Sequence, residues 1–168
     1  MNRQHEVFIA LGTNLGDRQL QLAEARRRLA EAIHIDRVSP IYETDPWGYE
    51  DQPDFLNQVL AGRTDLAPEA LLALVKSLEV ELGRQPTFRN GPRAIDIDIL
   101  VYDELAMQGP ELTVPHPKLA ERAFVLVPLR DIAPDLLVPG EGRTVETLYQ
   151  ELEDTASVRP WKEPHHHE

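Results

Sequence analysis

Two aspartates, Asp96 and Asp98, lie two positions apart in the most strand-like segment of the chain, where isoleucines alternate with them. Side chains at i and i+2 of a strand point to the same face, so we expect the two carboxylates to lie about 7 Å apart with the isoleucines facing the core. Neighbouring carboxylates repel, and magnesium relieves this because it takes one or two carboxylates together with waters and substrate phosphates. Two magnesium ions could share the pair. The alternative is a strand with a solvated acidic face.

An arginine-rich segment precedes the acidic pair. Residues 83–93 carry Arg84, Arg89 and Arg93 and no acidic residue. Arginine donates to phosphate in a planar, bidentate manner. Metal-binding acids next to such a segment favour phosphoryl transfer, which needs positioning and charge neutralisation. We expect the segment to close over a bound nucleotide. The alternative is that these arginines form ordinary ion pairs on the surface.

Further candidates lie outside this region. Residues 43–54 form an acidic, proline-containing loop with Trp47 and Tyr49, and aromatic rings on a loop suit stacking on a flat ligand. Trp47 could instead pack the loop against the body of the protein. Asn57 can both donate to and accept from the edge of a heterocycle. His116 lies between two prolines that restrict its backbone, although a lone histidine is often structural.

The hydrophobic pattern predicts the elements that position these residues. Alternation predicts strands, and apolar residues at helical spacing predict helices. The expected strands are 7–11, 34–42 with a break near Pro40, 55–63 and 95–102, with a short extended piece at 111–114; the expected helices begin at 17 and 68, and two more cover 120–130 and 144–153. The order βαββαβ indicates an α+β, ferredoxin-like fold with an antiparallel sheet, helices on one face and C-terminal helical additions.

Composition limits the possible functions. A chain of 168 residues with 42% hydrophobic residues predicts one globular domain over residues 1–160 and a polar tail over residues 161–168, where the histidines belong to a solvated tail or a tag remnant. Without cysteine, disulfides and thiolate sites are excluded. A net charge of −12 disfavours nucleic acid. No apolar run is long enough to span a membrane, and the first residues lack a signal-peptide layout. We expect a cytoplasmic monomer.

Several motifs together resemble one family, the 6-hydroxymethyl-7,8-dihydropterin pyrophosphokinases of folate biosynthesis. The most specific motif is residues 89–100 (RNGPRAIDIDIL), and the resemblance runs from about Val7 to about Pro139. Supporting motifs are GTNLGD at 12–17, YET at 42–44, DQPDFLN at 51–57, Glu79 with Gly83 and Arg84, LTVPHP at 112–117 and RAF at 122–124. The chain departs from the usual family pattern at Pro86, at Asn90 and in the sequence DPW at 45–47.

The resemblance implies an enzyme. It implies transfer of the diphosphate of MgATP to the hydroxymethyl group of the reduced pterin, with release of AMP and with two magnesium ions as cofactors. The implied catalytic and metal-binding residues are Arg84, Arg93, Asp96 and Asp98. The implied ATP-binding residues are Lys76, Glu79, Arg89, Ile99, Leu112, Thr113, His116 and Arg122, and the implied pterin-binding residues are Gly12, Thr44, Asp45, Trp47, Phe55, Asn57 and Phe124.

Two other functional classes fit the residues by themselves. A D-x-D pair also serves metal-dependent nucleotidyl and glycosyl transferases. A ferredoxin-like module could instead bind a ligand without catalysis, with its acids as a solvated face. Release of AMP, rather than free pyrophosphate or no product, separates the first function from both alternatives.

Overall fold

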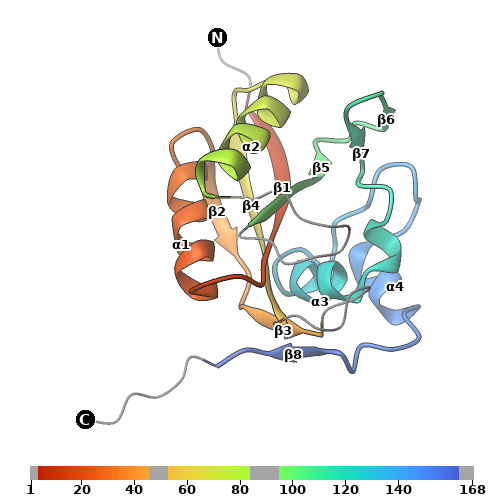
Figure 1. Ribbon diagram of the computed structural model, residues 1–168. Helices are drawn as coiled ribbons and strands as arrows, with labels where there is room; N and C mark the ends of the chain where they lie inside the picture. The colour runs from red at the N-terminus through yellow and green to blue at the C-terminus, as the bar shows by residue number, and fades with distance from the viewer. Residues whose placement is uncertain (1–3, 46–52, 84–94, 163–168) are drawn as a thin grey trace.

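The computed structural model describes residues 4–45, 53–83 and 95–162 (Figure 1). The strands are β1 His5–Thr13, β2 His34–Val38, β3 Tyr42–Thr44, β4 Phe55–Thr64, β5 Asp96–Tyr102, β6 Met107–Gln108, β7 Thr113–Val114 and β8 Val158–Pro160. The helices are α1 Arg18–Leu29, α2 Pro68–Glu81, α3 Ala123–Ile132 and α4 Val145–Gln150, with a 3₁₀ turn at Leu119–Glu121. The elements expected from the sequence are present, with shifted ends.

The main sheet is antiparallel and follows the order β5-β1-β4-β3-β8, with β2 also paired to β4. Strands β2 and β3 lie one after the other along the same edge of β4, separated at Ser39 and Pro40. The hydroxyl of Ser39 accepts a hydrogen bond from the Val59 N–H at 3.0 Å, which replaces a ladder bond at the break. The break expected near Pro40 is therefore confirmed.

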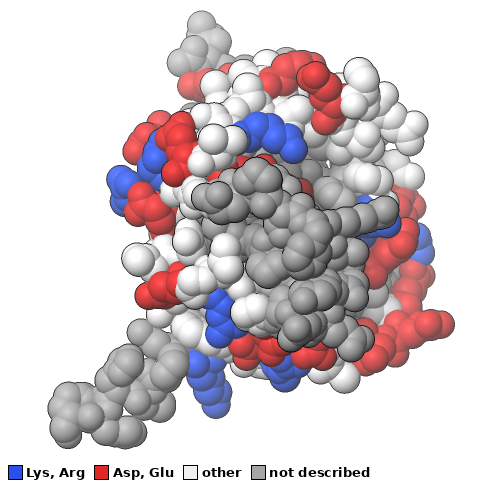
Figure 2. Space-filling view, in the orientation of Figure 1, with Lys and Arg blue, Asp and Glu red and all other residues white. Residues whose placement is uncertain are grey.

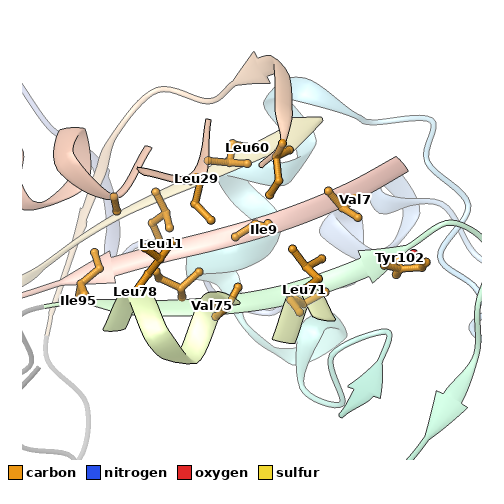
Figure 3. Close-up of a cluster of buried hydrophobic side chains, with 14 of the residues drawn as sticks. Val7, Ile9, Leu11, Leu29, Leu60, Leu71, Val75, Leu78, Ile95 and Tyr102 are labelled. Atoms are coloured by element: carbon orange, nitrogen blue, oxygen red, sulfur yellow. The ribbon is translucent and has the colours of Figure 1, made fainter. Parts of the chain in front are cut away.

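Helices α1 and α2 cover one face of the sheet. The Asp17 side chain accepts from the Leu20 N–H at the start of α1, and Pro68 occupies the first turn of α2, where a missing N–H costs nothing. Figure 3 shows the cluster between these helices and the strands, with Ile9 of β1 and Leu60 of β4 fully buried. The three central strands all contribute apolar side chains to this cluster, and the two helices cover them.

Helices α3 and α4, the expected C-terminal additions, cover the other face, a placement that the sequence did not predict (Figure 1). The reason is that outward-pointing residues of the central strands are also apolar, among them Phe8, Val59 and Leu100. These side chains lose contact with water only if a second helical layer covers them. Because both faces of the central strands carry apolar residues, a layer of helices packs on each side of the sheet.

The second layer covers only part of its face. Along β1 the outward residues change from Phe8 through Ala10 to Gly12, and along β4 they change from Ala61 and Val59 to Asn57. Position 12 of β1 is paired with Asn57 on one side and with Asp96 on the other. The end of the face that no described helix covers, here called the open half, is thus polar, and it carries Gly12, Asn57 and Asp96.

The C-terminal region differs most from expectation. Helix α4 is shorter than the predicted helix over 144–153, and strand β8 was not predicted. The Trp161 N–H donates to the Ile41 carbonyl at 3.0 Å, and its ring packs against the core cluster, although residue 161 was assigned to the tail. Within the described residues, no helix is long and apolar enough to cross a membrane.

Candidate active site on the open half of the sheet

Asp96 and Asp98 lie half-buried on the same face of β5, between isoleucines that are buried in the core. The predicted alternation is therefore confirmed. In the register of the sheet, Asp96 lies opposite Gly12 and Asp98 lies opposite Ala10. Because these β1 residues have little or no side chain, no bulky side chain of β1 lies beside the two carboxylates.

The position of β5 depends on a buried carboxylate from the other face. Glu79 of α2 is 4% exposed and accepts a hydrogen bond from the Ile97 N–H at 2.8 Å. Ile97 stands between the two aspartates, so this bond holds the backbone that carries them. A backbone N–H on the outer edge of a strand is satisfied in this way rather than by another strand.

His116 lies next to the acidic pair. Its N–H donates to the Leu100 carbonyl at 2.9 Å, which fixes it to β5. Burial lowers the pKa of His116 below its ordinary value, Asp98 opposes this shift, and the charges of Arg122 and Lys118 add to it. The ring Nδ1 accepts from the Lys118 N–H at 3.2 Å. A neutral His116 therefore carries its proton on Nε2, where it is a hydrogen-bond donor.

Arg122 and Phe124 lie at the start of α3. The guanidinium carbon of Arg122 is 5.3 Å from the centre of the Phe124 ring, within the range of a cation–π contact. Both side chains are half-buried, and the charge of Arg122 acts on His116. Asp98, His116 and Arg122 thus share one electrostatic environment, which combines a carboxylate with a neutral donor and a cation.

Asn57 lies across β1 from the acidic pair. It is 6% exposed, and its Nδ2 donates to the hydroxyl of Thr44 at 2.8 Å. A Cβ added at Gly12 would lie 3.2 Å from Asn57 Oδ1 and 3.9 Å from Phe55 Cδ1. Gly12 therefore allows the Asn57 amide and the Phe55 ring to approach the β1 backbone. The structure brings these four predicted pterin residues together.

The remaining predicted residues have varied positions. Arg84, Arg89, Arg93 and Trp47 lie outside the described residues. Lys76 is exposed on α2, and Thr113 is half-buried on β7. Ile99 and Leu112 belong to the core cluster on the α2 side of the sheet. Asp45 is exposed directly after β3.

The donor set fits magnesium rather than a metal held entirely by side chains. Within residues 4–45, 53–83 and 95–162, no group of three or more His, Cys, Asp and Glu side chains could hold a metal ion. Two half-buried aspartates with small residues beside them match magnesium, which keeps waters and accepts phosphate oxygens as further ligands.

Comparison with known proteins shows the family to which this chain belongs. Residues 8–134 match the model of the family described as 7,8-dihydro-6-hydroxymethylpterin-pyrophosphokinase. This chain belongs to that family. The 2-amino-4-hydroxy-6-hydroxymethyldihydropteridine pyrophosphokinase of Bacillus subtilis is 44% identical over 159 residues, which are 94% of this chain and 90% of that protein. The protein of the same name from Methylorubrum extorquens is 46% identical over 155 residues, which are 91% of this chain and 97% of that one.

The family fold is also found in a solved structure. Plasmodium falciparum HPPK-DHPS, crystallised with pteroate, matches 90% of this chain with a TM-score of 0.71 and 17% identity. This chain spans 43% of the length of that protein. At this identity the match supports the fold, and the assignment to the pyrophosphokinase family rests on the sequence relatives.

The sequence did not indicate the residues that bind the ends of β3 and β4 next to the candidate site. Asn14 donates to the Pro53 carbonyl at 3.1 Å, and Arg18 donates to the Asp54 carbonyl at 2.9 Å. Arg159 of β8 contacts both Asp45 and Asp54. These contacts join residues 36 to 114 positions apart, so no local spacing indicates them. Asn14 lies within the GTNLGD motif, which was its only signal.

Proposed function

We propose that this chain transfers the diphosphate of ATP to the hydroxymethyl group of 6-hydroxymethyl-7,8-dihydropterin and releases AMP. The observation that carries the proposal is the open polar half of the sheet, where Asp96 and Asp98 lie across Gly12 from Asn57. It places an acidic pair that can hold a metal ion near Asn57, whose amide can bind the edge of a heterocycle, in a chain of the pyrophosphokinase family.

Asp96 and Asp98 would hold two magnesium ions together with oxygens of the triphosphate. When bound, magnesium neutralises phosphate charge and orients the β-phosphorus for attack. The Glu79 bond to the Ile97 N–H keeps the two carboxylates at a fixed separation. Preorganised ligands need no rearrangement as charge develops, which lowers the barrier.

His116 and Arg122 would bind phosphate oxygens next to the metal-binding pair. The neutral ring of His116 donates from Nε2, because Nδ1 already accepts from the backbone. Arg122 contributes a half-buried positive charge. Arg84, Arg89 and Arg93 are proposed to complete the positive surroundings of the transferring group, as their spacing predicts.

The pterin would occupy the side of the site formed by β1, β3 and β4. Its flat ring would stack on Phe55 and Phe124, with Trp47 nearby. Asn57 is preorganised for the amide-like edge of the ring, because Thr44 fixes the orientation of its side-chain amide. Gly12 and Asp45 would add contacts at the same edge.

The adenosine would lie toward the outer edge of β5. We propose that Ile99, Leu112 and Thr113 border the adenine, since β7 lies against this strand. The side chains of Ile99 and Leu112 are largely buried, so the contact would use their backbone and remaining exposed atoms. Lys76 on the exposed side of α2 and Glu79 would lie toward the ribose.

The reaction needs no strong base. The pterin hydroxymethyl oxygen attacks the β-phosphorus, the bond from that phosphorus to the oxygen shared with the α-phosphate breaks, and AMP leaves with that oxygen. The hydroxyl proton passes to water or to a phosphate oxygen. Because phosphoryl transition states are loose, the nucleophile is deprotonated late, and positioning dominates the rate.

The strand order supports the ferredoxin-like classification. If β2 and β3 count as one interrupted strand along β4, the sheet order is the fourth, first, third and second strand, joined as βαββαβ. We propose that the molecule is this split βαβ arrangement with α3, α4 and β8 added at the C-terminus.

The deciding experiment measures nucleotide products. The full chain is incubated with ATP, magnesium and hydroxymethyl-dihydropterin, and AMP is quantified by chromatography. We expect AMP only when both magnesium and the pterin are present. Free pyrophosphate would instead indicate a nucleotidyl transferase, and magnesium-dependent ATP binding without any product would indicate a binding module.

A further inference from the structure

The C-terminal strand β8 forms the outer edge of the sheet beside the pterin side of the site (Figure 1). It pairs with β3 in antiparallel register, with Thr44 opposite Val158 and Glu43 opposite Arg159. The next residue after β8, Trp161, bonds to the Ile41 carbonyl and packs against the core. Strand β8 is therefore held by its pairing with β3 and by Trp161 at its C-terminal end.

Arg159 on this strand joins two segments that are separate in the sequence. Its Nη1 donates to Asp45 at 3.1 Å, and its Nη2 donates to Asp54 at 3.2 Å. Asp45 follows directly after β3, and Asp54 directly precedes β4. One guanidinium therefore sets the separation between the end of one strand and the beginning of the next.

The surrounding charges favour this contact. Glu43, Asp45 and Asp54 bring three carboxylates to one end of β3 and β4, and Figure 2 shows acidic and basic side chains next to each other along the lower edge, where β8 lies. Arg18 neutralises Glu43 at 2.7 Å and also donates to the Asp54 carbonyl. Arg159 lies between the other two carboxylates and reduces the repulsion between them.

The joined segments carry the proposed pterin residues. Thr44 lies opposite Phe55 in the register of β3 and β4, and its hydroxyl orients the Asn57 amide. A change in the distance between Asp45 and Asp54 therefore alters the end of the ladder on which Phe55 and Asn57 depend. By contrast, Asp96, Asp98 and His116 are held by β1, α2 and β5.

We propose that Arg159 is a positioning residue for the pterin: by binding Asp45 and Asp54 together, it fixes Thr44, Phe55 and Asn57 in the geometry that accepts the ring. The inference rests on the proposed function. It assigns the C-terminal strand a role in substrate affinity rather than in the transfer step, and it predicts that losing Arg159 weakens pterin binding without weakening ATP binding.

A purely structural role would give a different result. The side chain of Arg159 is 41% exposed, and those of Asp45 and Asp54 are 62% and 38% exposed. Exposed ion pairs contribute little to the free energy of folding. We therefore expect the melting temperature to change little, while the pterin, which senses the separation of the two strand ends, binds less tightly.

The test is Arg159→Gln in the full chain, with kcat and both KM values measured by AMP release. We expect the KM for the pterin to rise about three- to tenfold, with the KM for ATP and kcat within about twofold of the parent. Arg159→Lys should restore part of the affinity, since it keeps the charge but not the two-pronged geometry.

The matched control is Arg143→Gln. Arg143 is 42% exposed and also contacts two carboxylates, Glu141 and Glu151, but it lies next to α4. We expect unchanged kinetics for this variant. Equal kinetics of the two glutamine variants, or an equal rise in the KM for ATP and for the pterin, would overturn the inference. A parent enzyme without pterin-dependent AMP release overturns the proposed function and this inference together, whereas an active parent with an unaffected Arg159→Gln variant overturns the inference alone.

Discussion

The two faces of the central sheet use the same three strands in different ways. On the face of α1 and α2, here called the closed face, buried apolar side chains of β1, β4 and β5, among them Ile9, Leu60 and Ile97, pack into one core cluster. On the opposite face, α3 and α4 cover only the half that carries Phe8, Val59 and Leu100. The other half carries Gly12, Asn57, Asp96 and Asp98, and none of the described helices covers it.

The closed face and the open half therefore have different roles, the first in the stability of the fold and the second in the proposed reaction. The closed face contributes free energy of folding, since each large side chain there is removed from water. The open half lowers the stability of the fold, because it carries two carboxylates of like charge and, across β1, the buried amide of Asn57. A residue of the closed face also holds the strand that carries the two carboxylates, because Glu79 of α2 accepts a hydrogen bond from the Ile97 N–H. Substitutions on the closed face should therefore change the free energy of unfolding, whereas substitutions on the open half should change the kinetic constants.

The largest expected effect is on the open half. Asp98→Asn removes one of two carboxylates that would hold magnesium, and we expect kcat for AMP release to fall by about 10²- to 10³-fold. The unfolding midpoint should stay the same or rise, because a like-charge repulsion is removed. Activity within a few-fold of the parent at saturating magnesium would show that the pair does not hold the metal.

The reverse pattern is expected on the closed face. Leu60 is fully buried, and Leu60→Ala should lower the free energy of unfolding by about 2–5 kcal/mol, as measured by urea denaturation. At 25 °C the folded fraction should keep its KM values for both substrates. A selective change in either KM without loss of stability would contradict the division between the two faces.

Gly12 tests the open half without changing any charge. In Gly12→Ala the new Cβ would lie 3.2 Å from Asn57 Oδ1, which is tighter than ordinary contact. We expect the KM for the pterin to rise about tenfold and the KM for ATP to change little, because displacing a hydrogen-bonded amide costs about 1–2 kcal/mol. The double variant Gly12→Ala, Asn57→Ala should show less than the sum of the two single effects. Additive effects would mean that the two residues act separately.

The smallest expected effect is the pH dependence contributed by His116. Burial lowers the pKa of this ring in the folded protein, so below pH 6.5 the unfolded chain binds a proton that the folded chain does not. Stability from this group is therefore complete above pH 6.5 and is lost as the pH falls toward the folded pKa. In EDTA, the melting temperature of His116→Asn should therefore fall less than that of the parent between pH 7 and pH 5.5. Parallel melting profiles for parent and variant would contradict this sign.

Much of this architecture could be predicted from local patterns. Alternation of isoleucine and aspartate in 95–102 placed both carboxylates on one face, because a strand has a period of two. Pro68 and Asp17 marked the starts of α2 and α1 through backbone and capping preferences. Motif spacing indicated the family and most of the site residues.

Only the tertiary structure decided how these parts meet. The bond from Glu79 to Ile97 spans 18 positions, and the contacts of Arg159 with Asp54 and Asp45 span 105 and 114. Strand β8 is too short to show a periodic pattern of its own. It forms by pairing with an edge of β3 that exists only after folding. Local composition determines which residues prefer a strand, a helix or a turn, whereas contacts between distant residues depend on the packing of the whole chain.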